Sequence, residues 1–142
     1  CVGETKGKDH LLKQVHDLGL KSNVSIHGIV SKSILKDFYN KAHVNMLLSE
    51  RTLDGEIEGY GISILEGNIF GVPAIGSNHS GLKESIVPDQ NGILVNQDNP
   101  EEIINALKRI LSNYEEFYNN SIRYAKSNTW DDRIIKYENF IK

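Results

Sequence analysis

The stretch "EGYGISILEGNIFGVPAIG" (residues 58–76) contains an acid, a Gly-Tyr-Gly turn, a short helical pattern and a short apolar strand in direct succession. Apolar residues recur at helical spacing from Ile62 to Ile69, and Gly71 stands where such a helix would end. The run "VPAIGS" (residues 72–77) is typical of a brief strand. A turn, a helix and a strand in this order predict one unit of an alternating α/β fold.

Helical and strand patterns alternate over the rest of the chain as well. The apolar run 43–49 predicts a strand buried on both faces, and the polar run 50–57 predicts a surface loop. Four or five strands separated by helices predict right-handed crossovers and a parallel sheet, a Rossmann-like three-layer α/β/α architecture. The expected helices are 8–18, 33–42, 62–69, 100–111, 115–126 and about 130–141, with a shorter helical turn at 82–86, and the expected strands are 23–28, 43–49, 72–77 and 93–95.

The helix expected from Pro100 onward has a strong start signal. Asn99 is a good N-cap, Pro100 suits the first helical position, and Glu102 is placed to reach back in a capping box. The apolar residues predicted to be buried by this helix are Ile103, Ile104, Leu107, Ile110 and Leu111.

Length and composition narrow the class of protein. The 142 residues suffice for one domain with a real core, so we expect a single unit over 1–142. A net charge of −3 argues against broad phosphate neutralisation on a nucleic acid, and no apolar run approaches the roughly 20 residues that cross a bilayer. The sole cysteine, Cys1, favours a reducing, cytoplasmic compartment. Because the first residue is not Met, and Cys1 and Val2 look like the tail of a strand, we expect a fragment of a longer protein.

The glycine turn has the features of a phosphate-binding site. Gly59 and Gly61 allow the backbone to approach a ligand closely, because neither carries a Cβ. If a helix begins near Gly61, its N-terminus offers unpaired N–H groups and about half a positive charge. Glu66, one turn into the helix, could accept hydrogen bonds from vicinal hydroxyls, and Glu58 could do so for a second polyol. A nucleotide sugar has this layout of ribose, diphosphate and hexose.

A plainer interpretation of the two acids stays open. Glu58 is then a solvated loop acid, and Glu66 stabilises the helix dipole by about 0.3 to 1 kcal/mol. The Gly-x-Gly pattern alone is weak evidence for a nucleotide-binding turn. It lacks the third glycine of a dinucleotide-binding fingerprint and does not follow the first strand of such a fold.

These residues resemble the nucleotide-sugar-binding C-terminal half of retaining glycosyltransferases of the GT-B fold, the "group 1" family. The family pattern is an E-x7-E motif, approximately E-G-F-G followed by a helix with the second Glu and then G-x-P, and it is matched here by residues 58–76. Segments 23–49, 79–95 and 98–111 are similar to the neighbouring parts of the family pattern, so nearly the whole chain is covered. The implied fold is the C-terminal half of a GT-B protein without its first strand-helix segment, with the helix at about 130–141 packing toward the missing N-terminal domain.

The resemblance implies a role for each residue of the site. Glu58 would be the catalytic-site acid that contacts hydroxyls of the donor sugar, and Glu66 would bind the ribose hydroxyls. Leu65 would lie near the ribose. The backbone groups that would meet the sugar and the diphosphate are those of Gly59, Tyr60, Gly61 and Ile62, and the residues that would lie against the nucleobase are Gly28, Ile29 and Val30.

The implied activity is transfer of a hexosyl group, with retention, from a UDP-, GDP- or ADP-sugar to an unknown acceptor glycan or lipid, as in polysaccharide biosynthesis. No cofactor or metal is expected, and no nucleic acid. Peripheral membrane association of the longer protein is compatible with the resemblance. A GT-B-fold nucleotide-sugar epimerase and a non-catalytic α/β ligand-binding domain remain the alternatives.

This sequence departs from the family pattern at several positions. Gly67 follows the second acid where Ala is usual, which costs a helix about 0.8 to 1 kcal/mol. Leu48 stands where Pro commonly precedes Ser49, and Ser80 takes the first position of the usual glycine pair. The family's Arg and Lys that neutralise the diphosphate lie before the segment matched here. We therefore expect this polypeptide alone to have negligible transferase activity, because the negative charge that develops on the leaving diphosphate would lack the Arg and Lys that stabilise it in the family.

Overall fold

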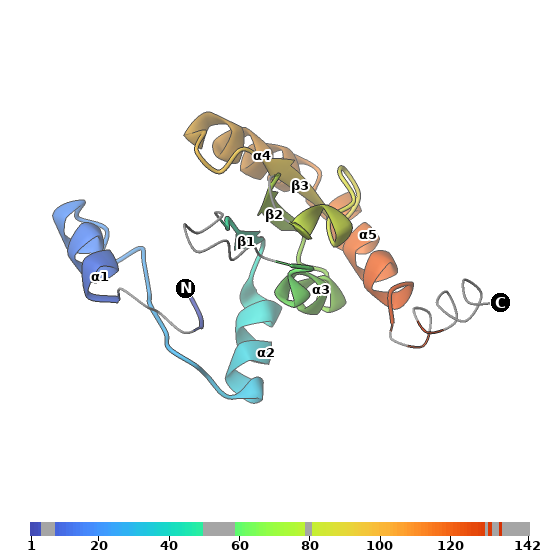
Figure 1. Cartoon of the computed structure of the whole chain (residues 1–142), viewed down its shortest axis with the longest axis horizontal. Coiled ribbons are helices and arrows are strands. Elements are labelled where there is room, and N and C mark those ends of the chain that lie inside the picture. Colours follow the sequence, from blue (N-terminus) through green and yellow to red (C-terminus); the bar gives the residue numbers. More distant parts are fainter. Residues whose placement is uncertain (4–7, 50–58, 79–80, 130, 132–133, 135–142) are drawn as a thin grey trace. The chain divides into compact units, whose positions relative to one another are not determined.

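A computed structural model describes residues 1–3, 8–49, 59–78, 81–129, 131 and 134 (Figure 1). Contacts divide the chain into two compact units, Cys1–Phe38 and Tyr39–Lys142, and the single domain over 1–142 stays a prediction. The predicted loop 50–57 and nearly all of the predicted helix at 130–141 lie outside the described residues.

The first unit contains helix α1 (Lys8–Asp17) and most of helix α2 (Lys32–Lys41). Helix α1 is followed by a left-handed glycine: Gly19 has φ 68°, and the N–H of Leu20 donates to the carbonyl of Val15 at 2.9 Å. The prediction of a strand at 23–28 is wrong. Among these residues only His27 pairs with another part of the chain in a β-bridge, an isolated one to Val2. The reason is local: the N–H groups of residues 23 and 24 bond back to the Leu20 carbonyl in a turn, which keeps them out of a sheet ladder.

The second unit is built on a parallel sheet. The described strands are β1 (Asn45–Leu47), β2 (Ala74–Ser77) and β3 (Gly92–Val95), in the order β1-β2-β3. Asn45 pairs with Ala74, and Ala74 pairs with Gly92, so the three strands begin at the same edge. The other elements of this unit are helix α3 (Ile62–Ile69), the short 3-10 helix η1 (Gly81–Glu84), helix α4 (Pro100–Ser112) and helix α5 (Tyr114–Lys126).

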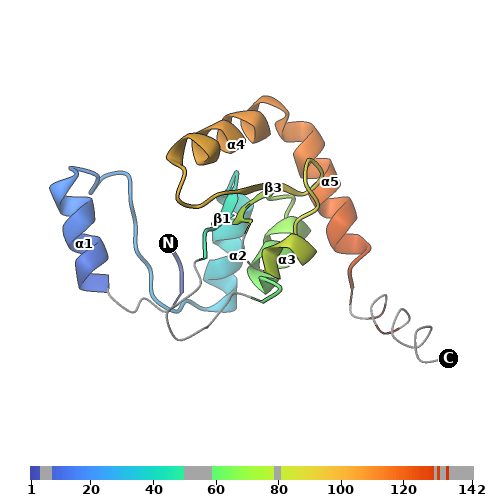
Figure 2. The same ribbon diagram turned by 45° about the horizontal axis from the view of Figure 1, so that its top comes forward.

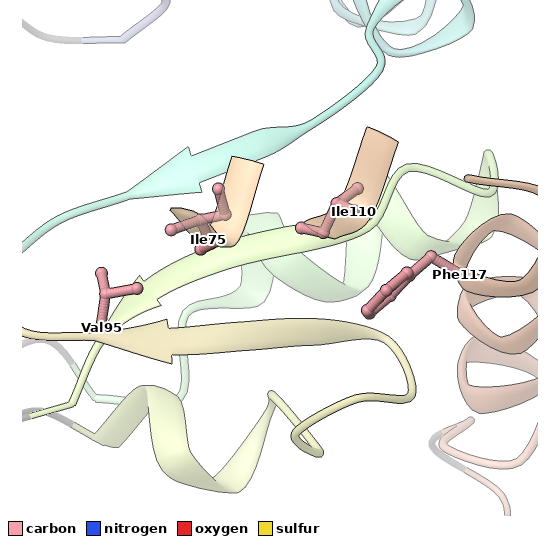
Figure 3. Packing of buried hydrophobic residues seen from close by; sticks show 5 residues of the cluster. Ile75, Val95, Ile110 and Phe117 are labelled. Carbon is pink, nitrogen blue, oxygen red and sulfur yellow. The ribbon is translucent and has the colours of Figure 1, made fainter. Parts of the chain in front are cut away.

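Helices cover both faces of this sheet, so the unit has the predicted three layers. Figure 2 shows α4 and α3 on opposite sides of β3. On one face Ile75 and Val95 of the strands pack against residues of α4 and α5, as Figure 3 shows for Ile110 and Phe117. On the other face the buried cluster consists of Ile64, Ala74, Leu82 and Ile86, contributed by α3, β2, η1 and the residues after η1. Strand residues alternate between the two clusters, as the pleat requires.

Two predictions of burial are wrong. The strand at 43–49 is not buried on both faces, because Met46 is 45% exposed; α4 packs over β2 and β3 and leaves β1 at the edge of the described sheet. In α4, Ile104 and Leu111 are about half exposed, at 49% and 50%. Ala106 takes a place in the core because its small side chain lets α4 approach the sheet.

The predicted cap of α4 forms, with one change in its geometry. The Asn99 side chain accepts hydrogen bonds from the N–H groups of Glu101 and Glu102. Glu102 reaches back, but its carboxylate accepts from the Asn96 N–H at 2.8 Å and from the Asn99 side-chain amide at 3.1 Å. The N–H of Asn99, the usual partner in a capping box, donates instead to the Asn96 carbonyl.

Two buried asparagines connect the segments that enter the strands. Asn91 donates to the Asn68 side-chain oxygen at 2.7 Å and to the Ser85 carbonyl at 2.8 Å, and it accepts from the Val87 N–H at 2.7 Å. Asn68 in turn donates to the Val72 carbonyl at 2.9 Å. Both side chains are fully buried, and these bonds compensate for the loss of water around them. The end of α3, the entry to β2 and the turn before β3 are therefore tied together.

We expect Asn91→Ala to lower the free energy of unfolding by about 3 kcal/mol, because it leaves the Val87 N–H and the Asn68 side-chain oxygen buried without their partner. Urea unfolding measures the change. The control is Asn119→Ala on the exposed face of α5, which should stay within about 0.5 kcal/mol of the unsubstituted protein. Equal effects of the two substitutions would contradict the structural importance of this network.

Candidate functional site

The predicted start of α3 is confirmed. Gly61 is the N-cap, with φ 64° and ψ 61°, and its carbonyl accepts from the Ile64 N–H at 2.8 Å. No side chain caps this end among the described residues. The first N–H groups of an α-helix have no acceptor within the helix. The turn from Gly59 to Gly61 therefore leads into a helix N-terminus with donors available to an anion.

Tight packing at Gly61 requires a glycine. Its φ lies in the left-handed region, and a Cβ would overlap the side chain of Leu82 in η1 and contact Leu47 of β1 at 3.4 Å. These contacts place the helix start beside the carboxyl end of β1 and beside the segment that follows β2. Ligands of parallel α/β sheets bind at this edge, so the position agrees with a binding site.

Two serines meet at the same edge. The hydroxyl oxygens of Ser49, after β1, and Ser77, the last residue of β2, lie 3.1 Å apart. These serines were not among the residues predicted for the site. The available signal was their position as the last residues of two predicted strands, which in a parallel sheet end at one edge.

Glu66 lies on α3 with an exposed side chain, one turn from the helix start. The hydroxyl of Tyr39 lies 3.3 Å from its Oε2 and 3.3 Å from the Ser63 carbonyl. Burial, followed by the negative charge of Glu66 and the hydrogen bond to its carboxylate, together raise the pKa of Tyr39 from 10.0 to about 12. Tyr39 therefore remains a hydrogen-bond donor at physiological pH. Tyr39 was not among the residues predicted for the site from the sequence.

Tyr60 directs its side chain toward helix α5. Its hydroxyl lies 3.4 Å from that of Tyr124, and Tyr124 donates to the Glu84 carbonyl of η1 at 3.1 Å. The Tyr60 hydroxyl is thus turned toward α5, and contact of the Tyr60 backbone with a ligand stays a prediction. Ile62 is 64% exposed and Leu65 is half-buried, so both are accessible from solvent.

The remaining predicted residues are not joined to this site by the described structure. Glu58 lies outside the described residues. Gly28, Ile29 and Val30 belong to the first unit, where they follow the bridge residue His27, and Ile29 is 84% exposed. Their contact with a nucleobase stays a prediction.

The described part of the chain contains no group of three or more His, Cys, Asp or Glu side chains that could hold a metal ion. Over the same residues, no helix has the length and apolar character needed to cross a bilayer.

Comparison with known families gives one match over most of the chain. A family described as "Glycosyl transferases group 1" matches residues 1–128. An uncharacterized glycosyltransferase of Methanocaldococcus jannaschii is 32% identical over 136 residues, which are 92% of this chain and 33% of the relative. A GDP-mannose-dependent phosphatidylinositol monomannoside mannosyltransferase of Mycobacterium tuberculosis is 29% identical over 78% of this chain and 29% of its own length. The chain thus spans about a third of these curated relatives.

Solved structures show the same fold. Sucrose-phosphate synthase from Thermosynechococcus elongatus superposes with a TM-score of 0.77 and 20% identity, covering 99% of this chain and 36% of that one. The Anabaena protein HepE, solved with UDP and glucose, gives a TM-score of 0.70 and 18% identity, covering 88% of this chain and 34% of that one. The predicted α/β Rossmann-like fold of GT-B glycosyltransferases is confirmed.

Gly61→Ala should destabilise the protein by about 2 to 4 kcal/mol, because the left-handed backbone is strained for alanine and the Cβ overlaps Leu82. Gly59→Ala is the matched control, since a Cβ there meets nothing within 4 Å and a change under about 0.5 kcal/mol is expected. Thermal and urea unfolding compare the two. Equal stability of both variants would rule out the close packing at Gly61.

The raised pKa of Tyr39 can be measured directly. Absorbance titration of the folded protein should show one tyrosine ionising near pH 12, and Tyr39→Phe should remove that step while Tyr118→Phe keeps it. The folded-state pKa exceeds the ordinary 10.0, so the stabilisation linked to this proton is complete below about pH 10 and is lost as the pH rises toward 12. An ionisation of Tyr39 at its ordinary pKa would contradict its burial beside Glu66.

Proposed function

This chain belongs to the group 1 glycosyl transferases, and we propose that it binds the nucleoside-diphosphate sugar from which a hexosyl group is transferred, with retention, to an acceptor glycan or lipid. The observation that carries the proposal is the N-terminus of α3. It has no side-chain cap among the described residues, it begins at a left-handed glycine, and it lies at the carboxyl edge of the sheet with an exposed acid one turn further on.

The diphosphate would bind at the start of α3. Backbone N–H groups from Gly59 to Ile62 can donate to phosphate oxygens, and the helix dipole favours negative charge there. During transfer the bond between the sugar and the diphosphate breaks, and negative charge grows on the leaving phosphate. Donors that are already in place stabilise this charge in the transition state at no cost of reorganisation.

The two acids would hold hydroxyls on either side of the diphosphate. Glu66 is exposed and adjacent to the helix start, as a ligand for the ribose hydroxyls needs to be. A carboxylate that accepts from two neighbouring hydroxyls forms strong, charge-assisted hydrogen bonds. We assign Glu58 to the hydroxyls of the donor sugar, and Gly28, Ile29 and Val30 to the nucleobase. Neither assignment includes a metal or another cofactor.

Relatives and neighbours support the class of donor without fixing its base. A similar protein of Mycobacterium tuberculosis is named as GDP-mannose-dependent, and the Anabaena neighbour was solved with UDP and glucose. GDP-mannose is a nucleoside-diphosphate sugar, and UDP and glucose are the two parts of such a sugar. UDP, GDP and ADP sugars therefore all remain in the proposal.

Calorimetric binding of UDP, GDP, ADP and their hexose derivatives tests the proposal. At least one should bind, and Glu66→Ala should weaken it by about 10- to 100-fold, the loss expected for hydrogen bonds to a charged group. Glu116→Ala, an exposed acid on α5, is the matched control and should leave the affinity unchanged.

Three outcomes are distinguishable. Binding that depends on Glu66 supports both the donor class and the ribose assignment. Binding that Glu66→Ala leaves untouched contradicts the ribose assignment alone. A protein that binds none of the nucleotides contradicts the proposed function.

A further inference from the structure

We propose that Tyr39 is a positioning residue for the donor site, which holds the Glu66 carboxylate in the orientation that binds the two ribose hydroxyls. The inference rests on the proposed function and extends it to a residue on a different helix. Tyr39 comes from α2, 27 positions before Glu66, and its hydroxyl is 3.3 Å from Glu66 Oε2.

The hydroxyl proton of Tyr39 has two possible acceptors, and the surroundings favour Glu66. The other acceptor, the Ser63 carbonyl, already receives a shorter hydrogen bond of 2.7 Å from the Asn45 side-chain amide. A carboxylate is also the stronger acceptor, because the bond to it is charge-assisted. Asn45 therefore satisfies the helix carbonyl and leaves the tyrosine proton for Glu66.

The tyrosine ring is itself fixed. It stacks on Phe70 with ring centroids 5.6 Å apart and an interplanar angle of 14°. A Cβ on Gly67 would lie 3.0 Å from the Asn45 amide nitrogen and 3.5 Å from the Tyr39 ring, so glycine at this helix position lets both side chains reach α3. A donor that cannot swing away can hold the carboxylate in one rotamer before the ligand arrives.

Holding one carboxylate oxygen leaves the other for the ligand. Among the described residues, Tyr39 is the partner of Oε2 and no hydrogen bond is made to Oε1. A flexible glutamate on a helix surface loses rotamer freedom when it binds a ligand, and a carboxylate that is already oriented loses less. Tyr39 would thus increase affinity for nucleotides that carry both ribose hydroxyls and would contribute little for nucleotides that lack one.

The test compares ribose with deoxyribose. The affinities of UDP, GDP and ADP, each with its 2′-deoxy and 3′-deoxy form, are measured for the unsubstituted protein, Tyr39→Phe and the control Tyr118→Phe. Tyr39→Phe should weaken the ribonucleotide that binds by about 3- to 10-fold and the deoxy forms much less. Tyr118→Phe, on α5, should retain the full preference for ribose.

A second measurement separates positioning from general stability. In a Glu66→Ala background, Tyr39→Phe should cause no further loss of affinity, because the carboxylate that it orients is gone. Equal weakening of ribo and deoxy forms, or a further loss in that background, would show a merely structural role and overturn the inference. An unchanged ribose preference in Tyr39→Phe would also overturn it and leave the proposed function intact. If the unsubstituted protein binds none of these nucleotides, both proposals fail.

Discussion

The buried hydrogen bond between the side chains of Asn68 and Asn91 determines how α3 lies on the sheet. Asn68 is near the C-terminal end of α3, and Asn91 directly precedes β3, so the bond anchors the helix at the amino edge of the strands. Because the far end of α3 is fixed there, the direction of the helix places its N-terminus at the carboxyl edge. A different packing of α3 would leave the side-chain amides of these two asparagines without hydrogen-bond partners, which is costly in a part of the protein that excludes water.

The candidate site depends on how closely other groups approach α3. Gly61 allows the helix to begin against Leu82, and Gly67 allows Asn45 and Tyr39 to reach its side. Alanine at position 67 would be a better helix former by about 0.8 to 1 kcal/mol. The structure gives a physical reason for the glycine, since a Cβ there would press on the Asn45 amide that binds the Ser63 carbonyl. Helix propensity is thus lower at the position where Asn45 and Tyr39 pack against α3, next to Glu66, the residue proposed to bind ribose.

Much of the second unit could be predicted from the sequence, because its signals are local. Helical spacing gave α3, α4 and α5 to within a few residues, Asn99 gave the start of α4, and the alternation of elements gave a parallel sheet. The predictions that failed depend on neighbours. Met46 and Ile104 are apolar and correctly spaced, yet both are about half exposed. Met46 lies on β1, at the edge of the described sheet, whereas α4 packs over β2 and β3, and Ile104 is on the side of α4 outside the buried cluster. The run at 23–28 has strand composition, yet the turn after α1 takes its first N–H groups.

The sequence by itself determined the order of elements and the Gly-Tyr-Gly turn that leads into α3, since both follow from backbone preferences of residues close together in the chain. It also supplied the motif on which the resemblance to the family rests. Only the tertiary structure decided which distant side chains meet, both at the candidate site and at the opposite edge of the sheet. Tyr39 meets Glu66 across 27 positions, Ser49 meets Ser77 across 28, and Asn68 meets Asn91 across 23. Such pairs are set by how helices and strands pack, and packing depends on the shapes of all side chains in the core together.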